Sequence, residues 1–467
     1  MSHDSRERLL RDAAERGIRY LQDLDKRTVY PEPDDLQRLE KALASPLPDA
    51  PTNSSEVLSF LDDLGSPATV SSAGGRYFGF VTGGALPATV AANWLATAWD
   101  QNCFVFAGSP AVALFEETAL GWLKDVLELP VSAEGTLVTG ATMANFSCLA
   151  SARGEVLRRA GWDVESRGLS GAPEIKLIVG EEVHASVLKV LGMLGLGRDT
   201  VQRVAVDEQG RMRTDALPRF SGPAIVCLQA GNVNSGAFDP AEQIIPLAHE
   251  QGAWVHVDGA FGLWASASPA LKAQVRDFKA ADSWATDAHK WLNVPYDCGV
   301  AFVRSPEALH RAMSISGSYL LRGKSRDAID VTPDSSRRAR AVEVWAALKS
   351  LGRTGLAELV ERNCRQAKWL AEHLAAAGVE VLNEVNLNQV VVCFGNDERS
   401  RRVISTLQGS GVCWCGSTTW QGRHAMRISL SSWATTDADV EKTLAAILAA
   451  RESEYTNSDA EKTERGP

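Results

Sequence analysis

The 467-residue sequence has no apolar run approaching the roughly 20 residues that a membrane-spanning helix needs. Its N-terminus, MSHDSRERLLRDAAERG, is charged where a signal peptide would be apolar. A long basic run is also missing, and 48 basic against 58 acidic residues leave a formal charge of -10. This balance argues against binding to nucleic acid or to an anionic membrane. We therefore expect a soluble, cytoplasmic protein.

Cysteine clusters with a known chemical use are missing as well. The eight cysteines are scattered, and the closest pair, in CWC at 413–415, has neither redox nor zinc-ligand spacing. We expect reduced thiols that mostly occupy the core. The pair His256 and Asp258 is a poor candidate for a metal site, so we expect no metal.

The chain is too long for one ordinary core, and its patterns divide it into parts. Residues 1–75 combine a helical pattern with repeated prolines and predict an N-terminal helical arm. In residues 76–330, strand-like and helical runs alternate, which predicts an α/β fold with a mostly parallel sheet covered by helices. Residues 331–450 predict a smaller α+β domain, and the polar segment 451–467 predicts a flexible tail.

Candidate functional residues follow the predicted strands, because ligands of open α/β sheets bind at the carboxyl ends of the strands. In TGATMANF a strand passes into a helix whose free N–H groups, with the hydroxyl of Thr142, could hold a phosphate. Asp258 ends an apolar strand, His184 begins a helix, and Lys290 follows a histidine in DAHKW. Taken singly, each feature has a common structural explanation. The helix start can be an ordinary cap, Asp258 a member of an ion pair, His184 a structural histidine and Lys290 a surface lysine.

Together, an amine, a carboxylate, a ring and a phosphate cradle are what pyridoxal 5'-phosphate (PLP) requires. Lys290 would form the Schiff base with the cofactor aldehyde. Asp258 would pair with the pyridine nitrogen and keep it protonated, so that the ring can accept electrons. His184 would lie on one face of the ring, and the small Ala260 would leave room on the other.

The ordered motifs TGATMAN, EEVHASV, GNVNSGAFDP, HVDGAFG and DAHKWLNVPYDCG resemble the group II PLP-dependent decarboxylases, which act on aromatic amino acids, glutamate or diaminobutyrate. The resemblance covers roughly residues 10–445 and implies a fold-type I PLP enzyme that works as a homodimer on a small L-amino acid. It implies Ala141, Thr142 and His289 around the phosphate and Asn232 at a cofactor-side polar position. Ala288 and the segment GGRYF depart from the proline and the histidine–proline pair that are common in the family.

The reaction and the substrate are predicted from further positions of this resemblance. Tyr319 matches the tyrosine that returns a proton to the substrate carbon after carbon dioxide leaves, which favours decarboxylation to the amine. An apolar or aromatic substrate is indicated by four aromatic residues in segments that line the substrate pocket in the family: Tyr77, Phe78, Phe80 and Phe104.

Two other functions are open at this stage. A fold-type I aminotransferase would use the same lysine and aspartate and would hold the substrate α-carboxylate with an arginine, for which Arg427 is available. A decarboxylase is not expected to clamp the group that it must expel. A catalytically silent PLP-binding protein is the third possibility, and the presence of Lys290, Asp258, His184 and Tyr319 argues against it.

Overall fold

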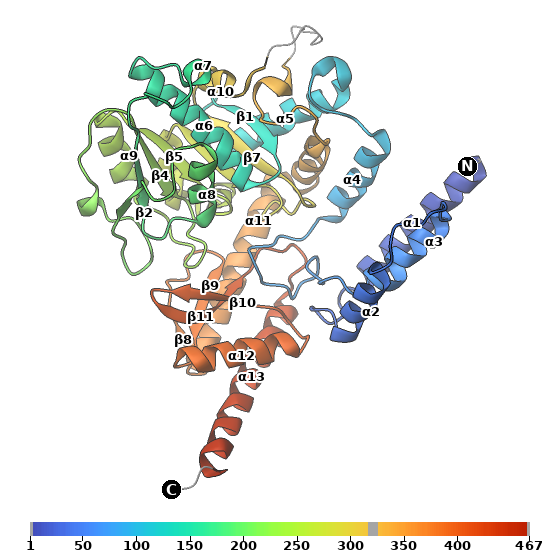
Figure 1. Ribbon diagram of the computed structural model, residues 1–467. Coiled ribbons are helices and arrows are strands. Elements are labelled where there is room, and N and C mark those ends of the chain that lie inside the picture. The colour runs from blue at the N-terminus through green and yellow to red at the C-terminus, as the bar shows by residue number, and fades with distance from the viewer. Residues whose placement is uncertain (1–2, 316–325, 465–467) are drawn as a thin grey trace.

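Figure 1 shows the computed structural model, which describes residues 3–315 and 326–464. A helical arm, a large α/β domain and a smaller α+β domain follow one another along the chain. Within the two described ranges, no helix is both long and apolar enough to cross a bilayer.

The large domain is built around a seven-stranded sheet in the order β1-β7-β6-β5-β4-β2-β3. Strand β7 is antiparallel to both of its neighbours, and the other pairs are parallel. The predicted mostly parallel sheet is thus confirmed, although the short β3 was not predicted. The strands are β1 (Glu134–Val138), β2 (Lys176–Gly180), β3 (Gln202–Val204), β4 (Ala224–Gln229), β5 (Trp254–Asp258), β6 (Ser283–Asp287) and β7 (Gly299–Val303).

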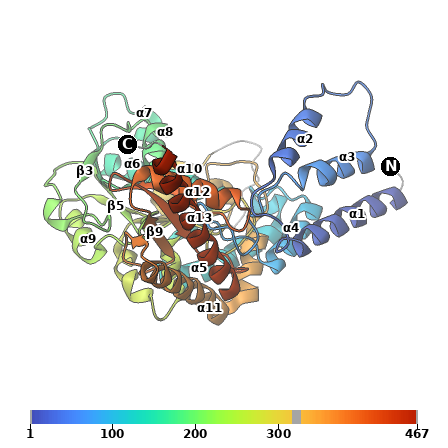
Figure 2. The ribbon, with the colours of Figure 1, turned by 90° about the horizontal axis from the view of Figure 1, so that it is seen from below.

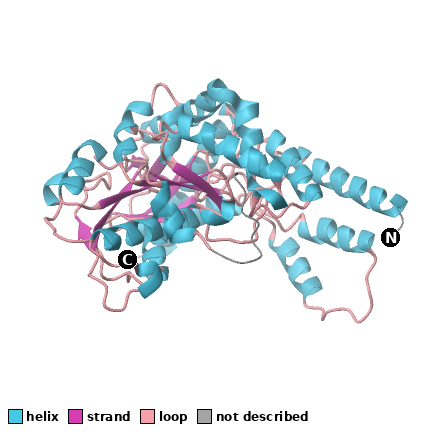
Figure 3. Ribbon diagram, turned by 90° about the horizontal axis from the view of Figure 1, so that it is seen from above, coloured by secondary structure: helices cyan, strands magenta, loops and turns pink. Residues whose placement is uncertain are grey.

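Helices cover both faces of this sheet, which lies in the middle of the domain in Figure 3. Strands β4 to β7 are buried along their whole length, and β4 and β7 accordingly read as apolar runs rather than alternating ones. The helices of this domain are α4 (Pro87–Trp99), α5 (Pro110–Val126), α6 (Ala141–Arg159), α7 (Val164–Arg167), α8 (Ala185–Met193), α9 (Ala241–Glu250) and α10 (Pro306–Met313).

The small domain contains an antiparallel sheet in the order β10-β11-β9-β8. The long α11 runs into it from the large domain (Figure 2). Helix α13 continues to Glu464, so the segment predicted as a flexible tail begins as helix. The elements are α11 (Arg340–Ala376), β8 (Glu380–Val381), β9 (Gln389–Cys393), α12 (Asp397–Gly409), β10 (Gly416–Trp420), β11 (Arg423–Ser429) and α13 (Asp437–Glu464).

The N-terminal arm consists of α1 (His3–Gln22), α2 (Pro33–Leu43) and α3 (Ser54–Phe60). It projects away from the body of the chain in Figures 1 and 2. No residue of α2 or α3, both described in full, is buried. The arm therefore has almost no core of its own.

Candidate active site

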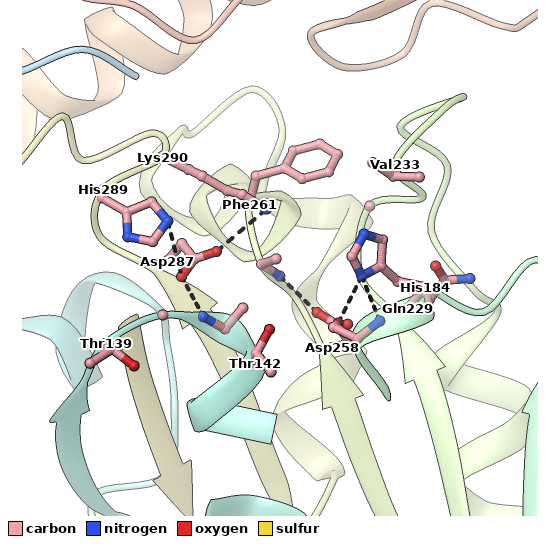
Figure 4. A pocket seen from close by; sticks show the side chains of 15 residues that line it. Thr139, Thr142, His184, Gln229, Val233, Asp258, Phe261, Asp287, His289 and Lys290 are labelled. Carbon is pink, nitrogen blue, oxygen red and sulfur yellow. Dashed lines mark hydrogen bonds and ion pairs between the residues drawn. The ribbon is translucent and has the colours of Figure 1, made fainter. Parts of the chain in front are cut away.

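The functional residues gather at one edge of the large sheet. Strands β1, β2, β4, β5 and β6 all end there, because β7 alone runs in the opposite direction. A cavity of about 340 Å³ opens at this edge, a volume typical of small-molecule sites. Figure 4 shows it from close by, and its lining comprises Thr139, Gly140, Ala141, Thr142, His184, Ser186, Gln229, Gly231, Val233, Asp258, Ala260, Phe261, Asp287, His289 and Lys290.

Lys290 stands just beyond the end of β6, with its amine inside the cavity. Its Nζ lies 3.4 Å from Asp287 Oδ2 and 5.9 Å from the centre of the Phe261 ring. The backbone is held from behind by Gly83, where an added Cβ would lie only 1.6 Å from the Lys290 carbonyl oxygen. The neighbouring Phe80 and Val81 have φ of 54° and 58°, a conformation that such side chains seldom adopt. Backbone strain of this kind is typical of functional sites.

The predicted phosphate corner lies where β1 passes into α6. Ala141, Thr142 and His289, which the resemblance implies around the phosphate, all line the cavity, and that role stays a prediction. The structure adds Asp287, whose Oδ1 accepts a hydrogen bond of 2.6 Å from Ala141 N–H and lies 3.6 Å from His289 Nε2. Burial lowers the pKa of His289, and its Nδ1 accepts from Cys298 N–H at 3.1 Å. No pattern in the sequence singled out Asp287, although it lies three residues before Lys290 in DAHK.

Asp258 is fixed at the end of β5 by one donor on each carboxylate oxygen. Ala260 N–H donates to Oδ1, and Asn145 Nδ2 donates to Oδ2, both at 3.2 Å. Both donors stabilise the charged form of the carboxylate. Since each oxygen has a further lone pair, Asp258 can still accept a hydrogen bond from a group inside the cavity.

His184 caps the N-terminus of α8 and forms part of the cavity wall. Its Nδ1 accepts from Ser186 N–H at 3.2 Å and lies 2.7 Å from Ser186 Oγ. The pKa of His184 is lowered chiefly because the surrounding protein removes water from the ring; the charge of Asp258 opposes this shift, and the positive charges of Lys290 and Arg427 add to it. The ring is therefore neutral near pH 7, and Figure 4 shows it across the cavity from Lys290.

Asn232 is not among the residues that line the cavity. Its Oδ1 accepts from Asn234 N–H at 2.8 Å and from Ser235 N–H at 3.2 Å, so the amide caps its own loop. The neighbours Gly231 and Val233 line the cavity instead. The two backbone donors hold only the amide oxygen, whereas Nδ2 is buried without a hydrogen-bond partner among the described residues, and the role of Asn232 at the cofactor stays a prediction.

The four aromatic residues expected around the substrate divide into two groups. Tyr77 stacks on Trp414 with ring centres 5.2 Å apart, and Phe80 packs on the same indole at 5.4 Å. Burial, followed by the neighbouring Tyr296 and Tyr30, raises the pKa of Tyr77 to about 12, so its phenol is neutral. Tyr296 in turn lies 4.4 Å from the His289 ring. This aromatic group therefore lies beside the predicted phosphate corner, to which His289 belongs.

Phe78 and Phe104 do not belong to that group. Phe78 is 1% exposed and packs in the core of the small domain, because neighbouring residues of an extended segment point in opposite directions and Tyr77 takes the other side. Phe104 lies in the loop before α5, where its carbonyl accepts from Ile329 N–H, and it does not line the cavity. Tyr319 lies outside the described residues, and its role stays a prediction.

The residues at this edge fit PLP. The start of α6 and the Thr142 hydroxyl offer donors to a phosphate, and Gly140 keeps that corner open, since a Cβ there would lie 3.2 Å from the His289 ring. Lys290 supplies an amine for an aldehyde, and Asp258 supplies a buried carboxylate for a protonated ring nitrogen. The two ends of the cavity thus match the two charged ends of the cofactor.

Comparison with known proteins agrees with this fit. Residues 46–396 match the family described as the pyridoxal-dependent decarboxylase conserved domain. The aromatic-L-amino-acid decarboxylase of Drosophila lebanonensis is 27% identical over 406 residues, 80% of this chain and 98% of that protein. The L-2,4-diaminobutyrate decarboxylase of Rhizobium meliloti is 29% identical over 385 residues, 78% of this chain and 75% of that protein. The chain spans only 63% of the Bacillus atrophaeus aromatic-L-amino-acid decarboxylase, at 28% identity over 65% of its own length.

Two solved structures share the fold. Oryza sativa TDC, solved with PLP and tryptamine, has a TM-score of 0.88 at 22% identity, covering 97% of this chain and 99% of its own. Mouse CSAD has a TM-score of 0.89 at 22% identity, covering 96% and 99%. The likeness extends over the arm and both domains.

Proposed function

Since the chain belongs to the pyridoxal-dependent decarboxylase family and its cofactor is PLP, we propose that it converts an apolar or aromatic L-amino acid into the corresponding amine and carbon dioxide. The observation that carries this proposal is the joint placement of Lys290 and Asp258 in one cavity beside the start of α6. The fold class, the cofactor and the enzyme class predicted from the sequence are confirmed.

Each side chain has a separate task in this proposal. The bound cofactor supplies a ring that accepts electrons when a bond to the substrate Cα breaks. Asp258, held by two donors, would accept a hydrogen bond from the protonated ring nitrogen. Lys290 would hold the cofactor through its amine. His184, neutral at its place in the wall, would cover one side of the ring.

An aromatic or apolar substrate is supported by what surrounds the site. Tyr77, Trp414 and Phe80 form a continuous group of rings, and Phe80 leaves 65% of its surface exposed. Gly79 is required for this group, because a Cβ there would lie 2.2 Å from the Trp414 ring. An aromatic side chain could stack on these rings. The relatives act, by their names, on aromatic amino acids and on diaminobutyrate, so the family by itself leaves the substrate open.

A homodimer is part of the same proposal. Large apolar side chains are exposed along the arm and along α4, which lies beside it: Leu10, Ile18, Leu21, Trp94, Leu95 and Trp99. Phe80 and Tyr296 are also exposed, close to the active site. An arm without a core and an uncovered apolar surface of this kind favour association with a second copy. The eight cysteines are free thiols, which supports a reducing, cytoplasmic location.

The test is a screen of the purified, PLP-loaded protein against all common L-amino acids, with carbon dioxide and amine as the products measured. We expect the highest turnover with an aromatic or large apolar amino acid. Lys290→Ala should abolish turnover, whereas Lys279→Ala, on the surface of the large domain, should leave it unchanged. Faster release from glutamate, aspartate or diaminobutyrate would contradict the proposed substrate class.

One observation favours an aminotransferase as the second candidate. Arg427 is largely buried on β11, where its Nη1 donates to Val233 O at 3.3 Å, and burial lowers its pKa. Among the described residues no carboxylate pairs with it, so it could receive the α-carboxylate of a substrate. A requirement for a keto-acid acceptor in the same screen, without release of carbon dioxide, would establish this candidate in place of the first.

A further inference from the structure

Behind Asp258, a chain of buried polar side chains runs from β5 through α6 and β6. Asn145 Nδ2 donates to Asp258 Oδ2 at 3.2 Å, and Asn145 Oδ1 lies 2.8 Å from His256 Nε2. His256 Nδ1 lies 2.9 Å from Ser283 Oγ, which also accepts from Trp254 Nε1 at 2.9 Å. Apart from Asp258, which faces the cavity, all members are at most 1% exposed, so water cannot replace any of these bonds.

The direction of every hydrogen bond in this chain is determined by the charge at its end. If the Asn145 amide were reversed, its oxygen would face a carboxylate oxygen, so Nδ2 must point to Asp258. The amide oxygen then faces His256 and needs a donor, which makes Nε2 the protonated nitrogen of a neutral ring. His256 Nδ1 is left as an acceptor for the Ser283 hydroxyl, whose oxygen receives the Trp254 N–H. Each side-chain nitrogen and oxygen of this hydrogen-bonded chain thus has at least one hydrogen-bond partner.

We propose that Asn145 and His256 are positioning residues, which hold the Asp258 carboxylate in the orientation and charge state that the ring nitrogen of PLP requires. Neither residue lines the cavity, so each acts only through Asp258. His256 and Asp258 can share one partner because residues two apart along a strand point to the same face, here toward α6. Helix α6 therefore serves the cofactor twice, with its first turn at the phosphate and with Asn145, one turn later, at the carboxylate.

Burial also keeps this support neutral. It lowers the pKa of His256 to about 4, partly opposed by the charge of Asp258. The carboxylate is thus the one charge of the chain of hydrogen bonds, and it stays available for a cationic ring nitrogen. A charged imidazole in place of the neutral one would compete with the cofactor for the same carboxylate.

The inference rests on PLP as the cofactor, and its test measures PLP binding to the cofactor-free protein with no amino acid present. His256→Met removes the donor to Asn145 at similar volume, while His256→Gln places an amide N–H near the position of Nε2. We expect His256→Met to weaken PLP binding about tenfold, because the Asn145 oxygen loses its partner and the amide can turn. His256→Gln should weaken it by no more than about threefold.

The same pair is then compared in the Asp258→Asn background. If His256 acts through Asp258, His256→Met should change PLP affinity by less than about twofold there, because the carboxylate that it positions is gone. The cofactor-free His256→Met protein should melt below His256→Gln in both backgrounds, because it leaves the Asn145 oxygen unpaired, so a loss of PLP affinity confined to the Asp258 background separates positioning from general stability. Equal losses of affinity in the two variants, or an undiminished loss in the Asp258→Asn background, would overturn the proposal.

Asn145→Ala tests the inference independently if His256→Met does not fold. Alanine is favourable in the interior of α6, and this change removes the donor to Asp258 directly. We expect PLP affinity to fall at least as much as in His256→Met. Wild-type affinity in Asn145→Ala would refute the positioning role. Because no substrate enters the assay, either result stands whether or not the amino-acid screen finds the expected product.

Discussion

Replacing Gly83 by alanine should displace the lysine of the active site without touching its side chain. A Cβ at position 83 would lie 1.6 Å from the carbonyl oxygen of Lys290, whereas ordinary contacts begin at 3.4 Å. The two backbones would have to separate by about 1.8 Å, the difference between these distances. A flexible side chain could turn aside from such a contact, but a backbone carbonyl cannot. The strain therefore falls on the segment that carries Lys290.

Two magnitudes follow from this separation. Forcing an extra methyl group into a packed backbone contact costs about 1–3 kcal/mol, and the short distance places Gly83→Ala at the upper end. A misplacement of about 1 Å in a reacting group costs about 100-fold in rate, so turnover should fall by at least that factor. PLP should also be retained poorly, as measured by the absorbance of the protein after gel filtration.

The matched control is Gly121→Ala in α5. The substitution adds the same methyl group at Gly121. This residue lies in the middle of the helix on its exposed face, and no atom lies within 4 Å of the added Cβ. There the substitution should raise the free energy of unfolding by about 0.5–1 kcal/mol and leave turnover unchanged. The reasoning is refuted if Gly83→Ala keeps the PLP content, turnover and melting temperature of the wild type, or if Gly121→Ala loses activity to the same extent.

Three further outcomes are expected. Because the pKa of His256 is about 4 in the folded chain and about 6.5 in the unfolded one, the unfolded state binds more protons between these values, and stability is lost as pH falls. Between pH 7 and pH 4.5 this group should remove about 2 kcal/mol from the free energy of unfolding. Urea denaturation should show that His256→Gln loses less free energy of unfolding over the same pH range. Identical pH dependences of the two proteins would contradict the lowered pKa of His256. Light scattering should give a mass of about twice the 50.3 kDa of one chain. Leu95→Glu on the exposed face of α4 should lower that mass, whereas Val131→Glu, exposed in the loop before β1, should not; a fully active wild-type monomer would contradict the dimer.

The sequence predicted those parts of the site that depend on one strand and the turn after it. Asp258 ends a strand, Lys290, His184 and Thr142 lie within four residues after one, and strands that run in parallel end at a common edge. Their convergence in one cavity needed only the correct assignment of six strands. The short β3 escaped because three residues with two exposed side chains show no apolar run.

The positions of several other side chains depend on long-range or turn contacts, which no local sequence pattern shows. Asn232 was expected at the cofactor, but its amide oxygen binds two N–H groups of its own turn. Tyr77 and Phe78 are consecutive aromatic residues, and only the pairing of their segment with Trp414 decides that the first joins the ring stack and the second enters the core of the small domain. Asn145 was read as part of a helix start, since its partners lie more than 100 residues away in the sequence.

The charges of the site explain why the cofactor would bind in a single direction. At one end, the start of α6 and the Thr142 hydroxyl offer hydrogen-bond donors, and Lys290 brings a positive charge that Asp287 balances at 3.4 Å. At the other end, Asp258 is a carboxylate whose supporting residues are neutral. PLP carries a phosphate on one side of its ring and a basic nitrogen on the other, so the reversed orientation would set the phosphate against Asp258 in a buried place, where like charges repel strongly. The neutral state of His256 contributes to this polarity, because a positive charge behind Asp258 would weaken the negative end of the cavity.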